Sequence, residues 1–151
     1  MEYIILKNMN TLVSLLTSDI LSTAINDTSN LIVSIFTDDY KNYPDLTYIL
    51  KDLDVIYKLN VIKNIIKIIP KKYEKIECIK TALLGVKDII HNIYILLIKI
   101  INIINIHKLK YLSYFRKINY KNELNELKLL IKLLDNRLYI LLELIKLFKI
   151  K

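Results

Sequence analysis

A long apolar segment, HNIYILLIKIINIINIHKL at residues 91–109, carries a lysine, Lys99, at its centre. A membrane-spanning helix needs about twenty mainly apolar residues, and a central lysine costs roughly 2.5–3.5 kcal/mol on insertion. Wound as a helix, the region has one narrow polar stripe at steps of three and four, which also takes in two isoleucines: Asp88, Asn92, Ile95, Lys99, Asn102 and Ile106. Such a helix is typical of the centre of a helical bundle, so we predict a central core helix.

The C-terminal segment repeats apolar residues at steps of three and four. They are Leu124, Leu127, Ile131, Leu134, Leu138, Leu141, Ile145 and Phe148. Because a straight helix over residues 121–150 would be about 45 Å long, we expect a break near Asp135 and Asn136. One long helix that dimerises through the 124–148 stripe is the alternative.

The remaining pattern predicts several shorter helices. Capping residues and breakers indicate helices from Asn10 or Thr11 to Ile25, from Thr28 or Ser29 to Phe36, from Asp45 to Leu59, over residues 61–69 up to Pro70, and from there to Leu84. Gly85 is either a break or a close-packing point, and one glycine with two prolines leaves too few turns for an all-β fold. We therefore predict an all-α, single-domain bundle of about six to eight helices over residues 1–151.

Charge divides the chain near residue 60. Residues 1–60 carry eight acidic and four basic side chains, whereas residues 61–151 carry seven acidic and nineteen basic ones. Half of the chain is Ile, Lys, Asn and Tyr, the residues of AT-rich codons, so lysine abundance alone is weak evidence for a basic binding surface. The single Cys78 and the absence of a cleavable leader predict an intracellular, cytoplasmic protein without a signal peptide or a clear transmembrane anchor.

Catalytic signals are nearly absent from the sequence. There is no glycine-rich phosphate loop, and His91 and His107 lie sixteen residues apart with no paired Cys or His at ligand spacing. Cys78 lacks a base nearby in the sequence, and Glu123 with Glu126 fits the first turn of a helix, where acids favour the dipole. We predict no enzymatic activity, no metal site and no cofactor.

The richest basic segment is HKLKYLSYFRKINYKN at residues 107–122. Its lysines and arginine alternate with aromatic residues in a mixture that suits single-stranded nucleic acid or an anionic membrane surface. The residues are Lys108, Lys110, Tyr111, Tyr114, Arg116, Lys117 and Lys121. The PKKYEK cluster at residues 70–75 could extend the same patch. A polar connector between two core helices is the alternative.

Two stretches resemble the poxvirus Bcl-2-like proteins of the myxoma type. They are SNLIVSIFTDDYKNYPDLTYILKDLDVIYKLNVIKNIIK at residues 29–67, which is similar to the early helices of that family, and TALLGVKDII at residues 81–90, where the central helix of the family begins. The resemblance implies a viral modulator of host apoptosis or innate immune signalling that binds a BH3-type or signalling-adaptor helix in a groove. The implied lining residues are Leu50, Leu53, Ile56, Ile62, Ile66, Val86, Lys87 and Ile90, with Lys87 in the place of an arginine that pairs with an aspartate of the bound helix.

Overall fold

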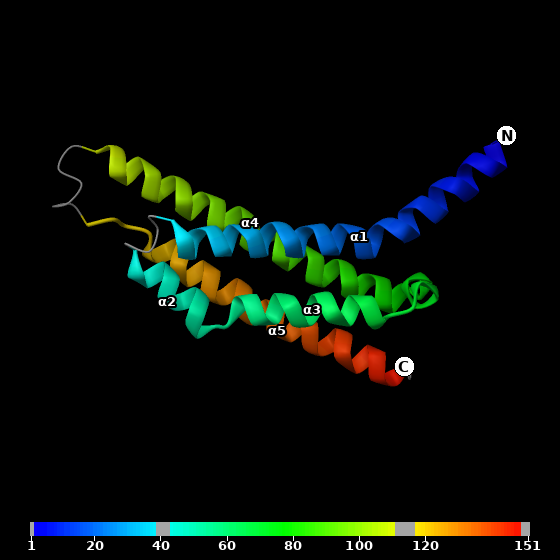
Figure 1. Ribbon diagram of the computed structural model, residues 1–151. Coiled ribbons are helices and arrows are strands. Elements are labelled where there is room, and N and C mark those ends of the chain that lie inside the picture. The colour runs from blue at the N-terminus through cyan, green and yellow to red at the C-terminus, as the bar shows by residue number, and fades with distance from the viewer. Residues whose placement is uncertain (1, 39–42, 111–116, 149–151) are drawn as a thin grey trace.

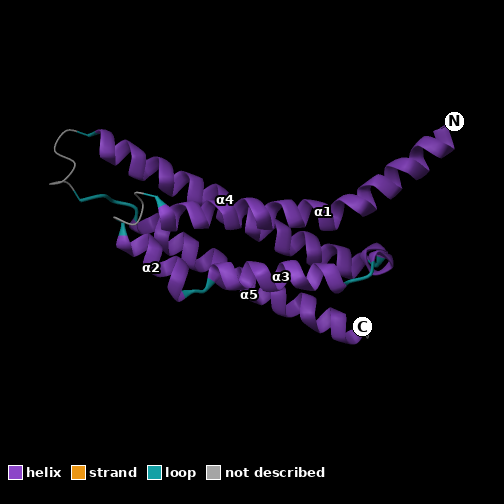
Figure 2. Cartoon of the chain, in the orientation of Figure 1, coloured by secondary structure: helices purple, strands orange, loops and turns teal. Residues whose placement is uncertain are grey.

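The structure is a computed structural model that describes residues 2–38, 43–110 and 117–148, with side-chain detail from Thr17 onward. Every regular element in these ranges is helical, as the purple ribbons of Figure 2 show. The elements are α1 (Glu2–Thr37), α2 (Pro44–Asp52), α3 (Val55–Ile68), the 3-10 helix η2 (Lys71–Lys75), α4 (Glu77–Leu109) and α5 (Lys121–Leu147). The predicted all-α class is confirmed, but the described residues form five α-helices, fewer than the predicted six to eight.

The helices lie side by side in an elongated bundle (Figure 1). α1 and α4 run in one direction, and α5 runs in the other together with α2 and α3, which follow each other end to end. α4 makes its most extensive contacts with α1 and α5, while η2 contacts both α1 and α4 and closes one end of the bundle. The N-terminal part of α1 extends beyond the other helices.

The central helix is present as predicted. The apolar residues of α4 that are buried in the core are Ile79, Leu83, Val86, Ile89, Ile90, Ile93, Leu96, Leu97, Ile100 and Ile104. All six residues of the predicted thin stripe, from Asp88 to Ile106, are exposed. Among the described helices α4 is the one long and apolar enough to cross a membrane, a property that core helices share.

α1 is one continuous helix, so the predicted division between Ile25 and Thr28 is wrong. Thr28 was expected to cap a second helix, but its buried hydroxyl donates a hydrogen bond of 2.8 Å to the carbonyl oxygen of Ala24, one turn earlier. Thr23 does the same with the carbonyl of Asp19 at 3.0 Å. A hydroxyl that bonds back to the preceding turn is satisfied inside the helix, and it therefore does not end the helix.

The predicted helix from Asp45 to Leu59 is also wrong, because the chain breaks earlier, at Leu53 and Asp54. Asp54 adopts the left-handed conformation with φ of 51°, which aspartate tolerates better than most residues. The break shifts the phase of the apolar positions, so that Val55 and Leu59 point into the core. α3 then ends at Ile68, just before Pro70, as predicted.

α5 has no break at Asp135 and Asn136, contrary to the prediction. The carboxylate of Asp135 pairs with the ammonium of Lys58 on α3 at 3.0 Å, and the Arg137 guanidinium donates a hydrogen bond of 2.6 Å to the carbonyl oxygen of Gly85 on α4. Gly85 itself lies inside an unbroken helix against the Arg137 side chain, so it is a packing point and not a break. A helix of this length fits because the bundle is elongated: at 1.5 Å per residue α4 is about 50 Å long.

The repeating apolar stripe of α5 packs inside its own chain. Leu124, Leu127, Ile131, Leu134 and Leu141 are all in the core, and Leu138, Ile145 and Phe148 pack against it. The five buried side chains therefore already have partners within the chain.

Candidate functional site

The residues of the predicted groove are mostly part of the core. Leu50, Ile62, Ile66, Val86 and Ile90 are at most 8% exposed, and Leu53 and Ile56 are half-buried against the same cluster. A bound helix reaches the five buried side chains only if the bundle opens. In the structure as it stands, Leu53 and Ile56 are the apolar members of this set that retain exposed surface.

Lys87 is half-buried at the junction of α4 and α1. Its ammonium is 3.1 Å from the carboxylate of the neighbouring Asp88. With His91 it lines a shallow hollow of about 370 Å³ opposite Asp19 and Asp27 of α1. The acidic surroundings of Lys87 therefore come from its own chain.

The structure separates the two basic clusters that the sequence analysis joined. Lys71, Lys72 and Lys75 are exposed just before the start of α4, whereas Lys108 and Lys110 are exposed at its end. The length of α4, about 50 Å, lies between them, so they do not form one patch. The expected single surface is therefore corrected to two basic regions at opposite ends of the bundle.

The 107–122 segment is described only in part. Lys108, Lys110, Lys117 and Lys121 are exposed, and the ammonium of Lys108 lies 5.8 Å from the centre of the Tyr43 ring. The other residues predicted for this patch, Tyr111, Tyr114 and Arg116, lie outside the described residues. A nucleic-acid or membrane role for the segment stays a prediction.

Tyr43 and Tyr120 meet close to this segment, where α2 and α5 begin. Their rings pack edge to face with centres 6.4 Å apart. Burial raises the pKa of Tyr120 to about 12, and the negative charge of Asp45 and the proximity of Tyr43 act in the same direction. Tyr120 therefore serves the fold as a buried neutral phenol.

Residues with possible reactive chemistry are dispersed. Within the described part of the chain, no three His, Cys, Asp or Glu side chains lie close enough to hold a metal ion. Cys78 is exposed near the start of α4, and His107 is in the last turn of the same helix. Glu123 lies 3.7 Å from the ammonium of Lys99, which joins the start of α5 to α4. The expected lack of catalysis stays a prediction.

A hollow between α2 and α5 combines apolar and charged side chains. Its volume is about 430 Å³, and its lining consists of Tyr48, Ile49, Asp52 and Leu53 from α2 and the turn after it, with Lys128, Ile131, Lys132 and Asp135 from α5. Ile49 and Ile131 are 6% and 1% exposed, so they form the floor. The charged residues are exposed and form the rim.

Of these lining residues, only Leu53 was predicted to line a groove. The remainder were missed because the hollow joins two segments about eighty residues apart, and no local pattern marks their meeting. In the sequence Ile131 reads as ordinary core, and Tyr48 as an isolated aromatic residue.

Neither a protein-family model nor a curated protein matches the sequence, and no solved structure matches the fold. The assignment of a function therefore depends on the surfaces of this chain alone.

Proposed function

We propose that this chain is a non-enzymatic protein-interaction module that binds an amphipathic helix of another protein in the hollow between α2 and α5. One observation carries the proposal: the hollow has an apolar floor and a charged rim. Binding sites for helices have this composition, because apolar anchors supply affinity and polar neighbours set orientation.

The size of the hollow limits what can enter it. A volume of about 430 Å³ has room for a few apolar side chains and not for a whole helix. The Tyr48 side chain at one wall of the hollow is 67% exposed, so its ring can pack against an apolar side chain of the bound helix. The expected ligand is thus a short helix with apolar residues on successive turns.

The rim favours an acidic partner. Asp135 is already held by Lys58 at 3.0 Å, so its negative charge is compensated within the chain, and two lysines then face one remaining carboxylate, Asp52. Lys128 and Lys132 are exposed and one turn apart on α5, where both can reach a carboxylate above the hollow. In this arrangement Lys128 and Lys132 take the role that the resemblance implied for Lys87.

The resemblance to the poxvirus Bcl-2-like proteins makes BH3-type helices of the host the first partners to test. Labelled BH3-type peptides titrated with the purified chain should show saturable fluorescence anisotropy at both low and moderate salt. Tyr48→Ala should weaken binding about tenfold, which corresponds to roughly 1.4 kcal/mol. The double variant Lys128→Glu/Lys132→Glu should weaken binding as much or more, because it reverses the charge of the rim.

The matched control is Lys71→Glu/Lys72→Glu, which makes the same change of charge at an exposed site in η2. It should leave the affinity unchanged apart from a small general electrostatic effect. If both double variants weaken binding equally, the hollow is not the site. If no peptide binds, a BH3-type partner is excluded.

A further inference from the structure

α5 carries a second apolar stripe, on the side that faces solvent. Leu129, Ile140 and Leu147 are 57%, 54% and 72% exposed, and Leu133 is 36% exposed. The full stripe follows alternating steps of four and three residues: Leu129, Leu133, Asn136, Ile140, Glu143 and Leu147. It is distinct from the core stripe, and this alternation is the spacing with which one helix packs against another in a coiled coil.

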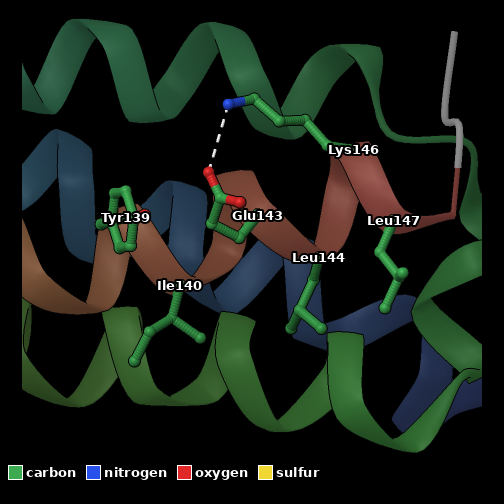
Figure 3. A pocket seen from close by; sticks show the side chains of 6 residues that line it. All are labelled: Tyr139, Ile140, Glu143, Leu144, Lys146 and Leu147. Atoms are coloured by element: carbon green, nitrogen blue, oxygen red, sulfur yellow. Dashed lines mark hydrogen bonds and ion pairs between the residues drawn. The ribbon is translucent and has the colours of Figure 1, made fainter.

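Figure 3 shows the C-terminal half of this surface. Ile140, Leu144 and Leu147 lie along one side of α5, and Tyr139, Glu143 and Lys146 lie along the other. Together they line a shallow depression of about 540 Å³. The stripe therefore has four apolar positions, with Asn136 and Glu143 between them and further charged side chains at its border.

We propose that this outer stripe is a dimer interface, in which α5 pairs in the opposite direction with α5 of a second copy of the chain. The partner is a second copy of the chain because the stripe has the same spacing when it is read in either direction. About a two-fold axis near Leu138, Leu129 meets Leu147 of the second copy, Leu133 meets Glu143, and Asn136 meets Ile140. A two-fold contact pairs one patch with the same patch on the second copy, and the spacing of these positions allows that, with Leu129 and Leu147 as the apolar pair.

The charged residues in and beside the stripe favour an antiparallel pair of helices over a parallel pair. In a parallel pair each Glu143 would face Glu143 of the second copy, which places two like charges together. In the antiparallel pair Glu143 lies next to Lys132 of the second chain, and the helix dipoles also oppose each other favourably. Glu143 is already 3.1 Å from Lys146 of its own helix, so the pair would join a small charged network.

The dimer is expected to be of moderate strength. The stripe spans residues 129–147, about 27 Å of helix, which places the contact at the low end of the size range of specific interfaces. Sedimentation equilibrium at roughly 1–100 µM should therefore show a monomer–dimer equilibrium with a dissociation constant in the micromolar range. A chain that stays monomeric throughout this range overturns the proposal.

Ile140→Lys should raise the dissociation constant at least about tenfold, because it places a charge in the centre of the interface. The matched control is Ile95→Lys, which changes an isoleucine of nearly equal exposure, 52%, on α4. Circular dichroism should show that both variants are folded. Equal effects of the two substitutions would overturn the proposal.

Disulfide cross-linking tests the direction. In a Cys78→Ser background, the double variant Leu129→Cys/Leu147→Cys should form covalent dimers on mild oxidation, whereas Leu129→Cys alone should not. The two positions are about 27 Å apart in one chain, so they cannot bond to each other within it. Efficient cross-linking of the single variant would show a parallel pair and overturn the antiparallel assignment.

Lys132 borders both this stripe and the hollow between α2 and α5, so it stays unchanged in the dimer tests. Because Ile140 does not line the hollow, loss of dimerisation and loss of peptide binding can be distinguished.

Discussion

Gly85 lies in the middle of α4 in an ordinary helical conformation, since no described glycine has a positive φ. A Cβ added there would lie 3.7 Å from Cδ and Nη1 of Arg137, an ordinary van der Waals distance. Because alanine is favoured over glycine inside a helix by about 1 kcal/mol, Gly85→Ala should raise the free energy of unfolding by about that amount. Urea denaturation of both chains measures the difference. A loss of stability would mean that the Arg137 side chain cannot adjust to the methyl group.

Tyr120 should make the fold sensitive to alkaline pH. Its pKa is about 12 in the folded chain, compared with about 10 for an ordinary tyrosine, so the folded state holds the phenolic proton more tightly. The resulting stabilisation is complete below pH 10 and is lost as the pH rises from 10 to 12. When the pH is raised from about 9 to about 11, the free energy of unfolding of the unmodified chain should fall by about 1 kcal/mol more than that of the Tyr120→Phe variant. Equal losses of unfolding free energy in the unmodified chain and in the Tyr120→Phe variant would contradict a raised pKa of Tyr120.

At the scale of the helix, faces were easier to predict than ends. The sequence placed the exposed stripe of α4 and the buried stripe of α5 correctly, because both follow from the periodicity of a helix. The ends depend on which partner a polar side chain finds. The Thr28 hydroxyl donates a hydrogen bond to the Ala24 carbonyl oxygen, and α1 continues through it. Asp54, in contrast, adopts a left-handed conformation and separates α2 from α3. Neither outcome follows from residue type alone.

The continuity of α5 is testable at the same scale. Asp135 and Arg137 are tied to α3 and α4 by Lys58 and the carbonyl of Gly85, so the middle of α5 is held from two sides. Native-state amide exchange should show residues 132–140 as strongly protected as the buried turns on either side. Lys58→Ala should lower this protection only slightly, because Arg137 remains in place. Fast exchange confined to residues 134–137 would restore the predicted break.

At the scale of the whole molecule, the elongated bundle determines which surfaces can cooperate. The lysine clusters at residues 71–75 and 108–110 become two separate basic regions, because α4 holds them about 50 Å apart. In contrast, Leu53 and Ile131 are distant in sequence and line one hollow. The hollow and the outer stripe of α5 lie on different sides of one helix, so one chain can present both to separate partners.

The sequence by itself determined the helical class, the central helix and the apolar faces that α4 and α5 bury, because periodicity and composition are properties of one segment. Only the tertiary structure decided that the residues of the expected groove belong to the core, and that α5 has a second apolar stripe left in solvent. It also decided that the hollow forms where α2 meets α5. These features depend on how segments far apart in the chain pack against each other, and a local pattern of residues does not predict that packing.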